Sequence, residues 1–158
     1  MRRLLLALCA ILFLAAPGGT PPPTIAVYSL VVDGAEVAIF SSCQPFGSES
    51  EVLVQIVGAT GTVVKLPGRT NILNVTCSRG FTSSLELASW RALVENGDVS
   101  SARKNVSLIA RDATLQPVGR WNFVNAWPSS LTYGTGPNAG ELIETFTLAV
   151  ENIQRVTP

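Results

Sequence analysis

Apolar and polar side chains alternate along several short segments, and this period of two is that of a β-strand. The clearest case spans residues 47–58, which we predict to be a strand with one dry face on a core and one mostly polar face toward water. One side of this strand carries Glu49, Glu51, Leu53 and Gln55, and the other carries Ser50, Val52, Val54 and Ile56.

Residues 24–42 predict a hairpin, because Asp33-Gly34 stands between two apolar runs and both residues of such a turn take positive φ. The glycines and proline of residues 58–70 predict a loop. Further strands are expected at residues 71–80, 104–113, 117–128 and 141–156. In the last of these, Glu144, Phe146, Leu148 and Val150 fall on one side and Ile143, Thr145, Thr147 and Ala149 on the other.

One segment, residues 82–97, has helical spacing of its apolar positions. Ser83 and Glu86 have the spacing of a capping box, and Asn96-Gly97 supplies a left-handed end. Many strands with one helix and no alternation of strand and helix predict a mainly β fold, an antiparallel sandwich or barrel with one flanking helix.

Residues 117–128 contain the densest group of aromatic side chains, and alternation places Trp121, Phe123 and Trp127 on one face. Pro128 lacks the N–H that a sheet needs, so we expect pairing to end there. The favoured interpretation is a core strand buried against the helix. A stacking surface for a sugar or a nucleotide is the alternative, but no basic cluster accompanies the rings.

The N-terminus has the pattern of a secretory signal peptide: Arg2 and Arg3, a short apolar run, then small residues. We predict a signal-like segment at 1–18, a proline-rich lead-in at 19–24 and one β domain at 25–158. An uncleaved membrane anchor and a misassigned start are the alternatives. Cleavage would export the protein to the periplasm or the cell exterior.

Removal of that segment would leave two cysteines, Cys43 and Cys77, in an oxidising compartment. A disulfide between them and two small buried thiols are both open interpretations.

The composition argues against nucleic-acid binding, catalysis and metal binding. Eleven basic residues balance eleven acidic ones, which gives no electrostatic signal for nucleic-acid binding. The chain has no histidine, so it lacks the commonest general base and metal ligand. We therefore expect no enzyme activity, cofactor or metal, and we interpret the neighbouring Glu49 and Glu51 as solvated carboxylates.

The order of motifs resembles the contractile-phage tail tube protein family. The similarity covers residues 25–156 and is carried by VVDGAEVAIFSSCQPFGSESEV, KLPGRTNILNVTCSRGFTSSLELASW, RKNVSLIARDA, VGRWNFVNAWPSSL and ELIETFTLAVENIQRV. Within the second stretch, the family pattern falls on Leu66-Pro67-Gly68, Asn74, Thr76, Arg79-Gly80, Thr82, Leu87 and Trp90.

The resemblance implies a β-sandwich whose six copies form a ring around a lumenal β-barrel, with rings stacked into a tube. In that arrangement Glu49, Glu51 and Gln55 would face the lumen. The segment formed by Ala59, Thr60, Gly61, Thr62, Val63 and Val64 would reach the next ring. Cys43 and Cys77 would lie on adjacent strands. Partners would be further copies, and sheath, baseplate or tape-measure proteins.

Two features depart from the family pattern: the signal-like segment, and Gln44-Pro45-Phe46 where members tend to have Ser-Gly-Leu. The first leaves the location open between an exported protein and a virion or an injection-system tube assembled in the cytoplasm. It also leaves two alternative functions, a cell-surface polymer with this fold and an exported monomeric binding module. A membrane contact is expected only through an uncleaved N-terminal segment.

Overall fold

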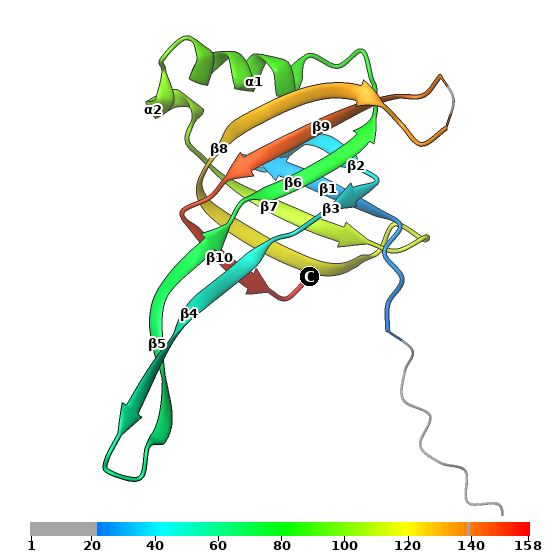
Figure 1. Cartoon of the computed structure of the whole chain (residues 1–158). Coiled ribbons are helices and arrows are strands. Elements are labelled where there is room, and N and C mark those ends of the chain that lie inside the picture. Colours follow the sequence, from blue (N-terminus) through cyan, green and yellow to red (C-terminus); the bar gives the residue numbers. More distant parts are fainter. Residues whose placement is uncertain (1–21, 139) are drawn as a thin grey trace, which may run out of the picture.

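The computed structural model describes residues 22–138 and 140–158, so the predicted signal-like segment and the first half of the lead-in, residues 19–21, lie outside the described residues. The described chain is mainly β, with two helices (Figure 1). Its elements are β1 (Val27–Val32), β2 (Ala35–Phe40), β3 (Ser42–Cys43), β4 (Gly47–Val57), β5 (Thr62–Leu73), β6 (Val75–Gly80), α1 (Glu86–Glu95), α2 (Val99–Ala102), β7 (Lys104–Arg111), β8 (Pro117–Thr135), β9 (Leu142–Ala149) and β10 (Asn152–Val156).

Two antiparallel layers share the long strand β8. Sheet A runs β2-β1-β7-β8-β10 and uses the first half of β8, whereas sheet B runs β8-β9-β6-β3 and uses the second half. The predicted hairpin at Asp33-Gly34 joins β1 to β2, and both turn residues have positive φ, 51° and 85°. The predicted antiparallel sandwich or barrel is therefore confirmed.

The core lies between the two sheets. Leu30, Leu108, Phe123, Phe146 and Leu148 are all buried there, each from a strand that alternates inward and outward side chains. The alternation predicted for residues 141–156 is confirmed through β9, but the segment divides into β9 and β10.

Helix α1 covers one end of the sandwich (Figure 1). Its Trp90 ring packs on Phe146 with centroids 5.7 Å apart, and the Trp90 Nε1–H donates to the Ala102 carbonyl at 2.7 Å. A buried indole with a satisfied N–H anchors the helix and the following short α2 to the core.

The start of α1 differs from the prediction. The helix begins at Glu86 after Leu85, which makes no side-chain cap, so the expected capping box from Ser83 does not form. Ser84 instead places its hydroxyl 3.4 Å from the Glu86 carboxylate. The second helix, α2, was not predicted, because a four-residue turn capped by Asp98 is too short to show a helical period.

Strand β8 also corrects the prediction, because pairing continues through Pro128 to Thr135. Asn125 has a positive φ of 52°, which shifts the alternation: Phe123 is buried, and so are Ala126 and Pro128. Trp127 therefore does not share the face of Phe123. Alternation alone could not reveal this irregularity.

Trp121 and Phe123 pack against a ring that the prediction did not include. Phe46 meets Trp121 edge-on at 5.0 Å and Phe123 at 6.3 Å between ring centroids. With Phe123 fully buried and Trp121 half-buried, these rings fill the core rather than form an open stacking surface.

Candidate assembly arm

A two-stranded hairpin projects from the body and is called the arm here (residues 47–73; Figure 1). Its strands β4 and β5 pair only with each other, in ten registered pairs from Gly47–Leu73 to Val57–Thr62. Each strand therefore has one free edge of unpaired backbone N–H and C=O groups. An isolated two-stranded hairpin is marginally stable in water, and long free edges favour pairing with another chain.

The predicted loop at residues 58–70 is wrong for most of its length. Only residues 58–61 form the turn, and β5 begins at Thr62 and includes Pro67 and Gly68. The register shifts between Ser50 and Val52, opposite this Pro-Gly pair, which is where a strand tolerates both residues. The segment predicted to reach the next ring is thus the arm's tip, its turn and the first residues of β5.

The outer half of the arm is apolar on both faces, which overturns the prediction that one face of residues 47–58 lies on a core. Every residue from Ser48 to Thr62 is exposed. One face carries Val52, Val54, Ile56 and Val63, exposed by 61%, 62%, 70% and 59%. The other carries Leu53, Val57 and Leu66, also exposed. Contiguous apolar surface of this kind marks an interaction site.

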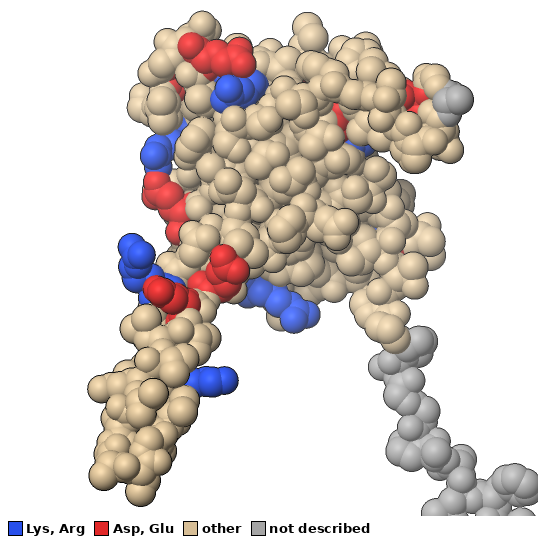
Figure 2. All heavy atoms as spheres, viewed as in Figure 1, with Lys and Arg blue, Asp and Glu red and all other residues tan. Residues whose placement is uncertain are grey.

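Charged side chains gather at the root of the arm (Figure 2). Glu49, Glu51 and Arg69 line a shallow hollow there, whereas Lys65 is the one charged residue among residues 52–66. Of the three predicted lumenal residues, Glu49 and Glu51 therefore lie at the charged root, and Gln55 lies among the exposed apolar side chains. Their orientation toward a lumen stays a prediction.

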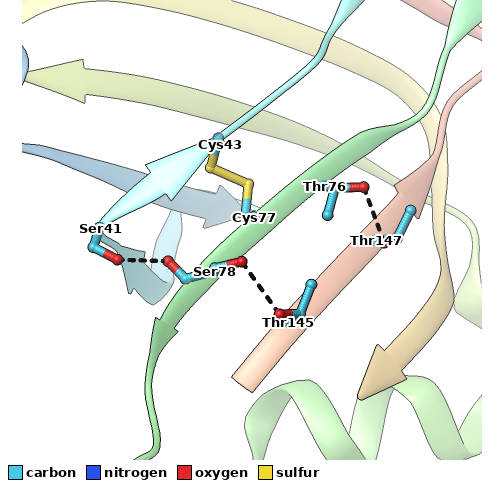
Figure 3. The surroundings of a disulfide bond; sticks show 7 residues. All are labelled: Ser41, Cys43, Thr76, Cys77, Ser78, Thr145 and Thr147. Atoms are coloured by element: carbon cyan, nitrogen blue, oxygen red, sulfur yellow. Dashed lines mark hydrogen bonds between the residues drawn. A yellow bond between two sulfur atoms is a disulfide. The ribbon is translucent and has the colours of Figure 1, made fainter. Parts of the chain in front are cut away.

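A disulfide joins Cys43 and Cys77, the two cysteines that the sequence left open between bond and thiols (Figure 3). They are directly paired residues of β3 and β6, with Cα atoms 4.0 Å apart. Strand β3 leads into β4 and β5 leads into β6, so the bond ties the chain on both sides of the arm. The arm is in this way covalently closed at its root.

The described part of the chain holds no group of His, Cys, Asp and Glu that could bind a metal ion. None of the helices described is long and apolar enough to cross a membrane. The most prominent surface feature of the described chain is the arm, which projects from the body (Figure 1).

A two-sheet body, one end helix and an apolar projecting hairpin define a structural subunit whose surface requires a partner. The chain belongs to the T4-like virus tail tube protein gp19 family, whose model matches residues 26–154. Comparison with curated protein sequences gave no match.

Solved structures share the fold. A chain of the anti-feeding prophage baseplate is 17% identical to this chain and superposes with a TM-score of 0.69. The match covers 87% of this chain and 97% of the baseplate chain. A chain of the anti-feeding prophage tube-terminating cap is 20% identical, with a TM-score of 0.67. The match covers 95% of this chain and 100% of the cap chain. A chain of the PVC sheath–tube complex, from an extracellular contractile injection system, is 19% identical, with a TM-score of 0.66. The match covers 87% of this chain and 93% of the PVC chain.

Proposed function

We propose that this protein is the subunit of a tail-like tube, in which six copies form a ring and rings stack. The arm carries this proposal, because its two apolar faces and two free edges have no partner within the described chain. Burial of a valine or isoleucine side chain contributes about 1.5–3 kcal/mol, so covering the arm strongly favours association. The role is structural, and no catalytic step is assigned to the chain.

Both faces of the arm are covered in the assembly only if the arm lies between copies of the chain. The outer half of the arm would pack on the adjacent ring, which covers its apolar faces, while the root half would pair edge to edge with neighbouring arms and continue the sheet around a lumen. This closure removes the free edges, as in any closed barrel.

Partners beyond further copies follow from the similar structures, which come from a sheath–tube complex, a baseplate and a tube-terminating cap. We assign sheath and baseplate proteins as the partner class, and a tape-measure protein stays a prediction from the family resemblance. The disulfide supports assembly in an oxidising compartment, because such bonds persist outside the reducing cytoplasm. Export through the N-terminal segment would meet that requirement.

The test compares the native chain with a variant whose arm is shortened. Ser50 and Thr70 are cross-strand partners, so replacing residues 51–69 by Asn-Gly closes the hairpin at the root and leaves the body intact. Negative-stain microscopy and sedimentation should show rings or tubes for the native chain. The variant should give no tubes while keeping its thermal unfolding transition.

Two outcomes would overturn the proposal. A native chain that stays monomeric across a wide concentration range would exclude self-assembly. Long tubes formed by the shortened variant would show that the arm is not the assembly element.

A further inference from the structure

The outward side of sheet B carries rows of hydroxyl groups, called the hydroxyl face here (Figure 3). Ser78 and Thr145 place their hydroxyl oxygens 3.2 Å apart, and Thr76 and Thr147 place theirs 3.1 Å apart, across β6 and β9. These positions alternate with buried residues of both strands, so they point away from the core. The rows continue onto β8 through the cross-strand partners of Thr145 and Thr147, which are Thr132 and Ser130.

The hydroxyl face has no charged side chain. Along β3, β6, β9 and residues 127–135 of β8, the charged residues are Arg79 and Glu144, and both are buried in contact with each other. The space-filling view agrees, because the middle of the surface over β6 and β9 is tan, while the larger groups of charged side chains lie at the rim and the arm root (Figure 2). The surface is therefore polar and neutral at once.

The outward side of sheet A is different. Arg120 donates to Ser107 at 3.1 Å, and Arg111 donates to Ser29 at 3.0 Å and lies 4.0 Å from the Glu36 carboxylate. The two outward faces of the sandwich thus have distinct chemistry, one charged and one built from neutral hydroxyls.

The arm is continuous with sheet B and not with sheet A. Strand β3 runs into β4, β5 runs into β6, and the Cys43–Cys77 bond holds this junction. A further hydroxyl pair, Ser50 and Thr70 at 2.8 Å, lies on the arm itself. If arms join neighbouring copies edge to edge, sheet B belongs to the same wall as the arms.

We propose that the hydroxyl face lines the lumen of the tube, so that the channel wall is neutral and hydrogen-bonding at the level of the body. This inference rests on the proposed function and adds the chemistry of the channel surface. A hydroxyl both donates and accepts hydrogen bonds, so such a wall is wetted by water. It carries no fixed charge to hold a polyanion or a basic protein, and cargo would slide along it without ion pairing.

The test uses single cysteines in a full-length chain with Cys9→Ser, where the native disulfide leaves Cys43 and Cys77 unreactive. Thr132→Cys places a thiol on the hydroxyl face, and Ser130→Cys repeats the test from a second position. Gln154→Cys, an exposed position of β10 beside Asn122, is the matched control on sheet A. Each variant is treated with a small maleimide and with a maleimide on a long polyethylene glycol chain, before and after assembly.

In tubes, a lumenal thiol should keep its reaction with the small reagent and lose its reaction with the large one. Reaction of Thr132→Cys with both reagents would place the hydroxyl face outside the tube, and reaction with neither would place it in a subunit contact. Either result overturns the inference while tubes themselves uphold the proposed function. A native chain that forms no tubes at all overturns the proposed function, and this inference falls with it.

Discussion

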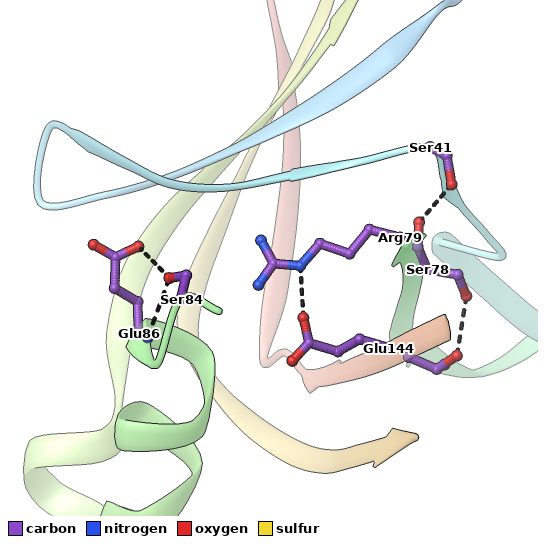
Figure 4. Close-up of polar contacts among 7 residues, drawn as sticks. Ser41, Ser78, Arg79, Ser84, Glu86 and Glu144 are labelled. Atoms are coloured by element: carbon purple, nitrogen blue, oxygen red, sulfur yellow. Dashed lines mark hydrogen bonds and ion pairs between the residues drawn. The ribbon is translucent and has the colours of Figure 1, made fainter. Parts of the chain in front are cut away.

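Arg79 and Glu144 face each other across β6 and β9 inside the sandwich, with the Arg79 Nε–H donating to Glu144 Oε2 at 2.6 Å (Figure 4). Both side chains are more than nine-tenths buried. The guanidinium also lies over the Phe40 ring, 5.6 Å from its centroid. Because each charge neutralises the other, sheet B keeps both of its charged residues inside and its outward face free of charge.

Replacing Glu144 with leucine should strongly destabilise the protein. The change leaves the Arg79 cation buried without its partner, and breaking a buried pair in this way costs about 3–5 kcal/mol. Urea unfolding followed by tryptophan fluorescence measures the free energy directly.

The matched control is Glu151→Ala, which removes the partner of Arg103 in an ion pair at the surface. Exposed pairs of this kind contribute about 0–1 kcal/mol. The double variant Arg79→Met with Glu144→Leu should recover much of the lost stability, because it leaves no unpaired charge. A single Glu144→Leu change no more costly than the control would contradict the assignment.

Local signals in the sequence predicted the body well. Asp33-Gly34 specified a turn, and alternation in residues 141–156 correctly grouped Glu144, Phe146 and Leu148 on one side, which the structure shows to be the inward side. These features succeed because the side-chain period and the turn residues are read within a few positions of each other.

Three features were not predictable in this way. Asn125 has a positive φ, which shifts the alternation of inward and outward side chains along β8, and nothing in the neighbouring sequence specifies that φ. Pro67 and Gly68 indicated a loop, but they lie at an irregular register of β5. Residues 52–57 indicated a strand with one face on a core and residues 62–66 indicated a loop, whereas both segments are largely exposed strands of the arm.

Removing the disulfide should loosen the arm before it unfolds the body. The bond closes a loop with a sequence separation of 34 that contains the arm, and such a link contributes about 2–4 kcal/mol. The double variant Cys43→Ser with Cys77→Ser should show that loss in urea unfolding. Backbone hydrogen exchange should increase most in β3, β4 and β5.

A reducing agent provides the internal control for this prediction. It should lower the stability of the native chain toward that of the double variant and leave the double variant unchanged. Equal exchange rates in the arm with and without the bond would show that the disulfide does not order the arm root.

The short helix α2 should respond to acid through the residue that caps its N-terminus, Asp98. Hydrogen bonds from Ser101 and Ser100 hold the pKa of Asp98 below its ordinary value. A carboxyl whose pKa is depressed in the folded state stabilises that state above the ordinary pKa, and the contribution is lost as the pH falls through the lower folded value. The affected window is therefore below about pH 4.

Asp98→Asn keeps an oxygen acceptor for the helix cap and removes the charge that titrates. Between pH 6 and pH 3 the melting temperature of the native chain should fall more than that of the variant, because only the native chain loses the Asp98 contribution. Other carboxyl groups titrate equally in both proteins and cancel in the comparison. An equal fall in melting temperature for the native chain and the variant across this pH range would rule out a stabilising charged cap at Asp98.

A single charge on the arm should abolish assembly without affecting the fold. Val54 is 62% exposed on the outer half of the arm, and Val54→Lys places an ammonium group where the proposal requires an apolar contact. Surface substitutions of this kind change folding stability by about 0.5 kcal/mol or less, but a charge buried without a partner opposes association. The sedimentation profile should therefore move from tubes to single subunits, with an unchanged urea midpoint.

Leu115→Lys is the matched control, because Leu115 is 61% exposed and lies in the turn between β7 and β8, away from the arm. That variant adds the same charge at nearly the same exposure and should assemble like the native chain. The comparison separates a local requirement of the arm from a general effect of added charge, which would affect both variants alike. Tubes that still form with Val54→Lys would show that this apolar face of the arm stays open to solvent in the tube. The face would then not be a contact between subunits.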